Sequence, residues 1–274
     1  MTRHVIIHAD DFGLHLAINA GIEASHLNGL VTSASLMPLG PAFEDAVRRC
    51  RYLPELDLGL HFTLVGVPGY PATLSTFLAA YASGKLPSHI VADALRRQLD
   101  AVLSTGLTLT HLDSHQHLHA LPGLMRVICP IAAEYGLRAV RLPLDGPALT
   151  HISTGRRAQA AALAMMARLS RRTITANGLQ TSDHFSGMAV SGHLTAPILA
   201  DYLTHAKSGL TEIVCHPGIR NAELTAAYDW GYDWQSETAA LCSVEAKKAA
   251  ESREIKFVGW TDYLPAKSPE TKKS

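Results

Sequence analysis

The segment HVIIHADDFGLHLAINAGIEASHLN (residues 4–28) joins a short apolar run to a longer run of helical period. Residues 4–9 are rich in β-branched side chains and predict a strand, and the apolar spacing over residues 16–28 predicts an amphipathic helix. Two aspartates, Asp10 and Asp11, occupy the turn between them. We interpret the segment as a βα unit with acidic side chains at the end of its strand.

The same alternation recurs along the chain. Further β-rich runs predict strands at residues 31–37, 58–64, 107–113, 137–142, 211–216 and 255–260. Helical periodicity falls near residues 41–52, 88–105, 121–136, 157–176, 195–207 and 235–252, and the stretch 66–87, rich in Gly, Pro and Tyr, is expected to be a loop. The alternation predicts an α/β fold with about seven parallel strands, either closed as a barrel or open and doubly wound.

Length and composition limit the domain organisation and the partners. A chain of 274 residues can form one α/β barrel domain, and no Pro/Gly/Ser-rich linker divides it. We therefore expect one domain over residues 1–264 and a disordered, polar tail over residues 265–274. The 24 Lys and Arg residues balance 24 Asp and Glu residues, so no net charge favours a nucleic acid as partner.

Cysteine usage and apolar run lengths bear on the compartment. The four cysteines lie far apart and form no CxxC motif, which argues against a disulfide framework and fits a reducing environment. The first apolar run is too short for the core of a signal peptide, and no later run is long enough to span a bilayer. We expect a soluble, cytoplasmic protein.

Side chains suited to binding metals or protons lie at the ends of five predicted strands. The carboxyl ends of the strands carry the chemistry in α/β barrels, so these side chains are predicted to share one rim. They are Asp10, Asp11, His61, His115, Arg141 and His216.

The most unusual segment is THLDSHQHLH (residues 110–119), which has four histidines and one aspartate at alternate positions. In an extended backbone all five side chains would point the same way. A catalytic divalent ion typically takes three protein ligands, so some of these histidines must serve other roles. The strand is expected to end near Ser114, which makes His115 the best-placed ligand.

The remaining members of this segment have several interpretations. His111 would lie deeper in the barrel, and Asp113 could orient a neighbouring imidazole. His117 and His119 would contact substrate or fix the loop. For His111 and His119, a purely structural, packed position is an equal alternative.

Other candidates also have a structural interpretation. A carboxylate of Asp10 or Asp11 could cap the following helix, and His61 alone could be a hydrogen-bonded core residue. Arg141 could hold a carboxylate or orient Asp10, although an arginine before a loop is often a surface charge.

His216 precedes Pro217 and Gly218, which force a turn directly after the sixth predicted strand. A histidine without a ligand partner nearby in the sequence suits proton transfer. Asp183 and His184, in SDHFSG, form a further candidate pair for substrate contact or for support of the ligands.

In this order and spacing, the motifs ADDFG, GLHFTL, HLDSHQHLH, RLP and CHPG resemble those of the YdjC-type carbohydrate deacetylases. This group contains chitooligosaccharide deacetylase and the hopanoid-biosynthesis-associated deacetylase, and the resemblance covers residues 4–260. It implies a deformed (β/α) barrel similar to polysaccharide deacetylases. It also implies a hydrolase that removes an N-acetyl group from an N-acetylglucosamine-containing substrate, releasing acetate and a free amine.

The resemblance further implies roles for individual residues. Asp11, His61 and His115 become the ligands of a divalent metal ion, Asp10 the general base and His216 the general acid. The implied metal is zinc or magnesium, and cobalt and nickel are also associated with the family. A bound cation activates water directly, so this route needs no covalent intermediate.

The implied substrate is either an N-acetylglucosaminyl hopanoid lipid or a chitooligosaccharide. The stretch TSDHFSGMAVSG (residues 181–192) is similar to the hopanoid-associated branch, whereas HLDSHQHLH is closer to the chitooligosaccharide branch. The predicted helix over residues 157–176, with its arginines, suits either peripheral membrane contact or packing on the barrel. A homodimer is common in similar proteins.

Two other functions are compatible with these residues. Histidine-rich barrels also host metal-dependent hydrolases of phosphate esters or cyclic amides. The same ligands could instead hold an ion in a non-catalytic, metal-dependent sugar-binding protein, which would bind N-acetylglucosamine oligomers without producing a free amine.

Overall fold

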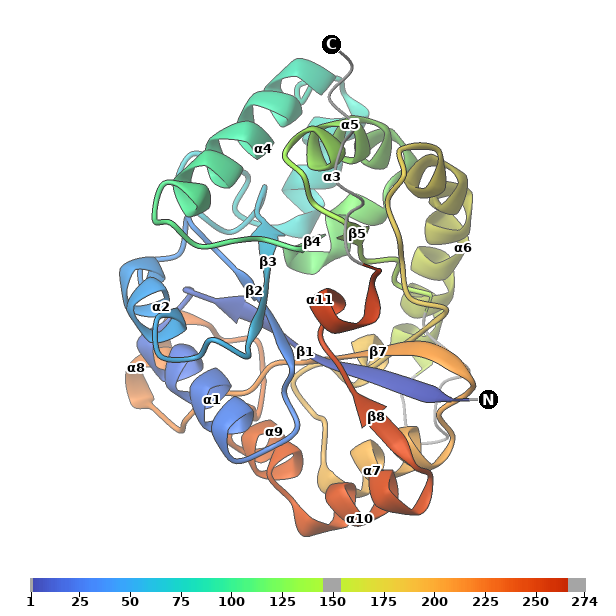
Figure 1. Cartoon of the computed structure of the whole chain (residues 1–274). Helices are drawn as coiled ribbons and strands as arrows, with labels where there is room; N and C mark the ends of the chain where they lie inside the picture. Colours follow the sequence, from blue (N-terminus) through green and yellow to red (C-terminus); the bar gives the residue numbers. More distant parts are fainter. Residues whose placement is uncertain (1, 145–153, 266–274) are drawn as a thin grey trace.

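The protein, described for residues 2–144 and 154–265 by a computed structural model, is built on one sheet of eight parallel strands (Figure 1). The strands are β1 (Arg3–Phe12), β2 (Ser33–Leu36), β3 (Asp57–Phe62), β4 (His111–Ser114), β5 (Ala139–Val140), β6 (His184–Ser186), β7 (Gly209–Cys215) and β8 (Ile255–Phe257). Their order in the sheet is β5-β4-β3-β2-β1-β7-β6, and β8 also pairs with β1. All seven predicted strands are present.

The sheet curls into a deformed barrel. Gln180, which precedes β6, joins the far edge of the sheet. The N–H of Val140 donates to the carbonyl of Gln180 at 3.0 Å, and the N–H of Gln180 donates to the carbonyl of Arg138 at 2.9 Å. These bonds link β5 to the chain that leads into β6, and the predicted α/β barrel is confirmed.

Helices cover the outside of the curled sheet (Figure 1). They are α1 (Leu16–Leu27), α2 (Phe43–Cys50), α3 (Leu74–Ala82), α4 (Ser88–Leu103), α5 (Pro122–Glu134), α6 (Thr154–Ala176), α7 (Ala196–Thr204), α8 (Ala222–Ala227), α9 (Trp234–Leu241), α10 (Val244–Ser252) and α11 (Trp260–Tyr263). Two short 3-10 segments, η1 (His115–Ala120) and η2 (Met188–Val190), follow β4 and β6 at their carboxyl ends. No helix among the described residues is long and apolar enough to cross a membrane.

Helix α11 closes the amino-terminal end of the barrel. Trp260 is fully buried and packs with Ile6, Ala139 and Leu210 inside the sheet. Asp57 anchors the helix, because its Oδ2 accepts the backbone N–H of Trp260 at 2.6 Å. With this end filled, the carboxyl ends of the strands form the accessible mouth of the fold.

Helices α9 and α10 were predicted as one helix over residues 235–252, and this prediction is wrong. The first helix ends at Leu241 and the second begins at Val244. The side chain of Ser243 accepts the N–H of Ala246 at 3.2 Å and thereby caps a new helix.

The predicted loop at 66–87 is only partly irregular, because it contains α3. Thr73 begins this helix with a capping box, in which its side chain and that of Thr76 bind each other's backbone N–H groups. Strand β6 was not predicted, since three residues are too few to show an alternating pattern. Residues 266–274 of the predicted tail lie outside the described residues.

Candidate active site

Asp10 and Asp11 both reach the mouth of the barrel because β1 is irregular where they lie. Consecutive side chains of a regular strand point to opposite faces. The pairing of β1 with β2 shifts between Ala9 and Phe12, and Asp11 has a left-handed backbone with a φ of 66°. Aspartate tolerates this conformation better than most residues. The irregularity therefore lets two successive carboxylates line one cavity.

The carbonyl of Asp11 accepts the N–H of Leu14 at 3.0 Å in the turn after β1, but the side chains that hold this turn are those of His15 and Asn19 and not the aspartate carboxylates. Helix α1 is capped by His15, whose Nδ1 accepts the N–H of Ala17 at 3.0 Å. The buried side chain of Asn19 accepts the N–H of Gly13 at 2.8 Å. Neither carboxylate is used as a helix cap, so the capping interpretation is wrong.

Asp11, His61 and His115 form one cluster, although they come from β1, β3 and the turn after β4. Each residue offers one atom that could bind a metal, a ring nitrogen or a carboxylate oxygen, and these three atoms lie within 4.8 Å of one another. The distance from Asp11 Oδ1 is 3.2 Å to His61 Nε2 and 3.0 Å to His115 Nδ1. All three side chains are buried. Two imidazole nitrogens and one carboxylate oxygen are a donor set found in catalytic zinc sites.

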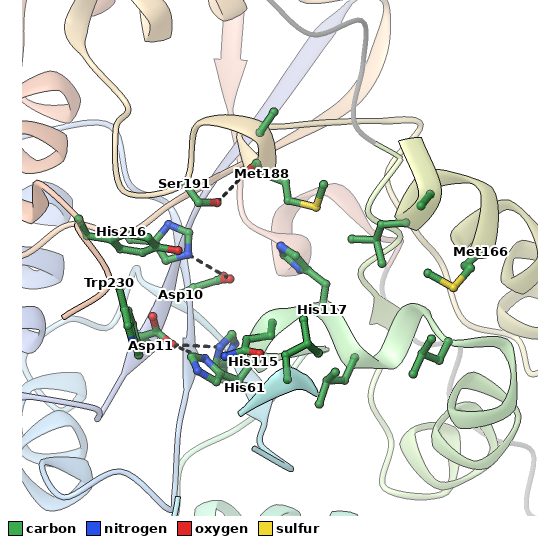
Figure 2. Close-up of a pocket in the computed structure, with 18 of the residues that line it drawn as sticks. Asp10, Asp11, His61, His115, His117, Met166, Met188, Ser191, His216 and Trp230 are labelled. Atoms are coloured by element: carbon green, nitrogen blue, oxygen red, sulfur yellow. Dashed lines mark hydrogen bonds and ion pairs between the residues drawn. The ribbon is translucent and has the colours of Figure 1, made fainter. Parts of the chain in front are cut away.

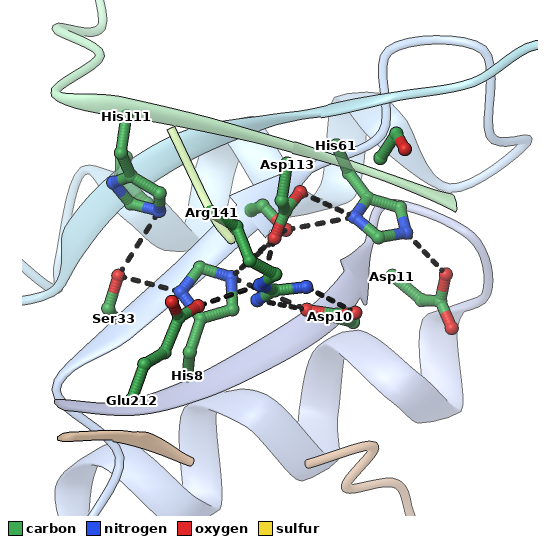
Figure 3. Close-up of polar contacts among 12 residues, drawn as sticks. His8, Asp10, Asp11, Ser33, His61, His111, Asp113, Arg141 and Glu212 are labelled. Carbon is green, nitrogen blue, oxygen red and sulfur yellow. Dashed lines mark hydrogen bonds and ion pairs between the residues drawn. The ribbon is translucent and has the colours of Figure 1, made fainter. Parts of the chain in front are cut away.

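Asp113 connects this cluster to a buried arginine (Figure 3). Its Oδ1 accepts the Nδ1–H of His61 at 2.8 Å, and its Oδ2 lies 2.7 Å from Nη2 of Arg141. A carboxylate behind a histidine ligand fixes the tautomer and the orientation of the ring. Here it leaves Nε2 of His61 directed at Asp11.

Arg141 is only 1% exposed, so it is not a surface charge. Its guanidinium donates two hydrogen bonds to the carboxylate of Asp10, at 2.9 and 2.8 Å, and its Nε donates to Glu212 at 2.7 Å. Paired bonds of this kind fix the plane of a carboxylate as well as its position. Arg141 therefore holds Asp10 in one orientation, with its Oδ2 3.9 Å from Nε2 of His216.

The charges of the cluster do not balance. Burial opposes the ionisation of Asp10, but Arg141 and nearby imidazoles outweigh it and lower the pKa. At Asp11 and Asp113 burial is again outweighed, by imidazoles and by Arg141 respectively, and both pKa values lie well below the ordinary range. Burial alone would lower the pKa of His61, yet the carboxylates around it, Asp113 first, raise it to about 10. Arg141 contacts the carboxylates of Asp10, Asp113 and Glu212, and Asp11 adds a fourth, so a divalent cation would offset an excess of negative charge.

His216 lies beside Asp10 in the cavity, and a buried glutamate holds its loop. The backbone N–H of His216 donates to Oε2 of Glu237, and the N–H of Leu194 donates to Oε1 at 3.2 Å. Glu237 lies in α9 and is fully buried. The ring of Tyr232 lies 5.3 Å from the ring of His216. Helix α9 thus sets the position of this imidazole.

The five odd-numbered residues of segment 110–119 do not share one face. The extended part is only the four residues of β4, so His111 and Asp113 alone follow the strand alternation. Gln116 and His117 then have positive φ values of 55° and 54°. The backbone turns there, and the later histidines point in different directions.

His119 fixes the turn, and His111 lies deeper in the barrel. The Nδ1 of His119 is 2.6 Å from Ser114 Oγ, and its Nε2 is 3.1 Å from the carbonyl of Arg141. The Nε2 of His111 is 3.3 Å from Ser33 Oγ. Both rings are hydrogen-bonded and buried, and neither belongs to the cluster of Asp11, His61 and His115.

Asp183 and His184 are not brought to the site, which corrects their predicted role in binding substrate or supporting ligands. Oδ2 of Asp183 accepts the N–H of Leu210 at 2.9 Å, and His184 pairs with Thr211. These partners lie at the amino-terminal end of β7, whereas His216 follows its carboxyl end. The pair therefore occupies the opposite rim of the barrel.

A cavity of about 540 Å³ opens onto the cluster (Figure 2). One end carries the polar residues together with Trp230, and the other end is apolar, with His117 between them (Figure 2). The apolar side chains come from the turn after β4 and from α3, α6 and η2. They are Leu74, Leu78, Leu118, Leu121, Ala162, Leu163, Met166, Met188 and Ala189.

Several residues of the site were not predicted. His8 is fully buried, with its Nε2 3.1 Å from Asp113 Oδ2 and 3.5 Å from Asp10 Oδ1. Its position two residues before Asp10 on a strand was the available signal, because such residues share a face. The available signal for Glu212 was that it is an acidic residue inside an otherwise apolar strand. Trp230, 5.6 Å from the ring of His115, lies in a loop without a recognisable pattern.

The fold and the site together define a class. The protein is an α/β barrel with a buried Asp-His-His cluster at the carboxyl ends of its strands, where barrels of this kind place their chemistry. The chain belongs to the YdjC family, since the family model described as YdjC-like protein matches residues 4–252.

Known relatives match the chain over nearly its full length. A carbohydrate deacetylase of Vibrio vulnificus strain YJ016 is 31% identical, covering 95% of this chain and 96% of the relative. A chitooligosaccharide deacetylase of Citrobacter koseri is 30% identical, covering 96% of this chain and all of the relative (100%). A solved structure from Enterococcus faecalis V583, named for cellobiose-phosphate cleavage, has a TM-score of 0.76 at 23% identity over 97% of this chain and 100% of that chain. This last likeness concerns the fold alone.

Proposed function

We propose that this protein is a metal-dependent carbohydrate N-deacetylase. It would hydrolyse an N-acetyl group on an N-acetylglucosamine-containing substrate and release acetate and a free amine. The names of the relatives support this activity. The proposal depends above all on the convergence of Asp11, His61 and His115 within 4.8 Å, beside Asp10 and His216 in one cavity.

Asp11, His61 and His115 would hold the metal ion. The donor set fits, because each residue offers one buried ligand atom and Asp113 already directs the His61 ring toward Asp11. Zinc suits two imidazoles and a carboxylate best, and magnesium, cobalt and nickel are the other candidates. When bound, such an ion polarises the acetyl carbonyl and lowers the pKa of a water molecule.

Asp10 and His216 would carry the protons. Arg141 keeps Asp10 ionised, so its carboxylate can accept a proton from the attacking water. The water oxygen adds to the acetyl carbon, and the carbon–nitrogen bond then breaks. His216 Nε2, on the same side of the cavity as Asp10 Oδ2, would donate a proton to the departing amine. Acetate and an amine are the balanced products.

The two-sided cavity supports a substrate with a polar and an apolar part. Trp230 and Tyr232 offer aromatic faces beside the polar end, where a sugar ring could stack. The apolar end would hold a hydrocarbon group attached to the sugar. We therefore favour an N-acetylglucosaminyl lipid, of the hopanoid type, over a chitooligosaccharide.

The test is to follow acetate while the purified protein is incubated with each divalent ion and with either an N-acetylglucosaminyl lipid or N,N′-diacetylchitobiose. Chelation should abolish acetate release. Asp10→Asn should retain the metal and lose at least about a hundredfold in turnover. His184→Gln, on the opposite rim, is the matched control and should keep full activity. Full activity without metal, or release of phosphate in place of acetate from phosphorylated sugars, would overturn the proposal.

A further inference from the structure

The outward face of α6 exposes apolar side chains where a helix on a barrel normally exposes polar ones. Met165 and Leu169 are 69% and 68% exposed. They lie one turn apart and so share a face of the helix. The opposite side of the helix is already buried through Ala167, Ser170 and Ile174. Packing on the barrel therefore does not account for the outward stripe.

The same face is basic. Arg168 and Arg172 are exposed and alternate along it with Met165 and Leu169. The helix contains five arginines and no Asp or Glu. Within the part of the chain that the structure describes, no ion pair joins Arg168, Arg171 or Arg172 to a carboxylate. Long cationic side chains that flank exposed apolar ones are typical of helices that lie in a lipid interface.

The stripe lies next to the apolar end of the cavity. Ala162 and Met166, on the adjoining side of α6, line that cavity, and Figure 2 shows Met166 at its apolar end. Leu78 of α3 lines it as well and is 41% exposed. A lipid surface held against Met165 and Leu169 would therefore stand beside the apolar cavity wall.

We propose that α6 docks this protein on the surface of an anionic lipid bilayer. Met165 and Leu169 insert at the level of the acyl chains, and Arg168 and Arg172 meet the phosphates of the headgroups. The docking brings the apolar end of the cavity to the bilayer surface, where an amphiphilic substrate would lie. This benefit to substrate uptake rests on the proposed function.

The experiment is flotation of the full-length, metal-loaded protein with vesicles of phosphatidylcholine alone or mixed with phosphatidylglycerol. The protein should float only with the mixed vesicles, and added salt should weaken the association. Met165→Ser/Leu169→Ser should abolish flotation, and Arg168→Gln/Arg172→Gln should weaken it at least about fivefold for each arginine. Leu27→Ser/Val244→Ser, which removes side chains that are 62% and 66% exposed on α1 and α10, is the matched control and should float as the parent does.

Two further measurements separate the possible failures. All variants should release acetate from soluble N,N′-diacetylchitobiose at the parental rate, because none of the altered residues lines the cavity. Acetate release without vesicle binding would overturn the docking and leave the proposed function standing. Vesicle binding without any acetate release would overturn the proposed function and leave the docking standing. A parent that is dimeric by light scattering, and monomeric after Met165→Ser/Leu169→Ser, would show that a second copy covers the stripe and would also overturn the docking.

Discussion

Arg141 is the residue on which the buried charges of the site depend. It lies against Asp10, Asp113 and Glu212 and is almost fully buried. A buried charge that loses its partner is strongly destabilising, because its desolvation is no longer compensated. Its position at the end of a predicted strand indicated a role, but its three partners come from strands far apart in the sequence.

Replacing this arginine should therefore lower stability as well as activity. Arg141→Met is expected to reduce the free energy of unfolding by about 3–5 kcal/mol, measured by urea denaturation. Arg141→Lys should recover part of that loss but little turnover, because an ammonium cannot form the paired bonds to Asp10. Arg51→Met, at an exposed position, is the control and should stay within about 0.5 kcal/mol of the parent. Equal stability of Arg141→Met and Arg51→Met would contradict this account.

His119 should make the stability of the fold depend on pH. Burial is the main cause that lowers its pKa to about 4, against an ordinary value of 6.5. The unfolded chain therefore binds the proton more readily than the folded one between these values. The stability is fully present above pH 6.5 and is lost as the pH falls toward about 4, by roughly 3 kcal/mol for this residue.

The measurement is the free energy of unfolding of the parent and of His119→Asn at pH 7 and near pH 4. His111 and His117 have lowered pKa values, mainly through burial, and act with the same sign, so the parent loses stability in either case. The variant should lose less than the parent over this interval. An identical loss in both proteins would rule out a neutral, buried His119.

At the scale of single residues, the sequence predicted which residues carry the chemistry better than it predicted which residues they contact. Asp11, His61 and His115 were predicted as ligands and lie together. His8 was overlooked because a histidine inside HVIIHA looks like a core position. The end of the strand near Ser114 was predicted, but the path of the chain after it was not, since the positive φ values of Gln116 and His117 leave no mark in the residue pattern.

Among the elements, α1 acts together with α9 to hold the loop after β7 that carries His216. Gly21 of α1 touches Gly218 so closely that an added Cβ would lie 2.2 Å from its Cα. Two backbones meet there, and neither can move aside as a side chain would. The imidazole two residues before Gly218 would have to shift with its loop.

Gly21→Ala should consequently reduce turnover by about tenfold to a hundredfold, since a shift of about 1 Å in a catalytic group costs this much. Metal affinity, measured by titration calorimetry, should be unchanged, because the ligands lie on other strands. Gly155→Ala is the matched control, as an added methyl group there meets open space. Parental turnover in Gly21→Ala would show that the loop is not set by this contact.

Element prediction succeeded for the long helix α4 and failed for a short strand and for a break inside one long helical pattern. The 16-residue helix α4 was predicted at 88–105 and observed at Ser88–Leu103. Strand β5, with two residues, was predicted six residues long because LRAVRL has strand-like composition throughout. The break between α9 and α10 depends on one serine cap, which a continuous helical period conceals.

On the scale of the whole molecule, the site is the place where distant strands are tied together. Its members come from β1, β3, β4 and β7 and from the residues that directly follow β4, β5 and β7. One hydrophobic core runs from Val5 to Ala250, which supports our proposal that residues 1–264 form a single domain. The alternating pattern predicted this architecture because each βα unit is formed by residues close together in the sequence. The closure through Gln180 is different, because it pairs with Ala139, which is distant in the sequence.

A metal ion that binds these strands only when they are folded should stabilise the whole barrel. With zinc at about a hundred times its dissociation constant, the free energy of unfolding should rise by about 2.7 kcal/mol, and Tm should rise accordingly. Calorimetry with zinc and with chelator measures this difference. It should vanish in His61→Asn and persist in His184→Gln, and a rise of equal size in both variants would point to a different binding site.

The left-handed backbone of Asp11 restricts how this site can be altered, by evolution or by design. His61 and His115 do not have positive φ values, so replacing them with other metal ligands depends on side-chain chemistry alone. The third position accepts few residues besides Asp, Asn and Gly, because most side chains clash with their own main chain in that conformation. A redesign toward another ion must therefore begin by straightening or rebuilding the first strand, and only then choose new donors.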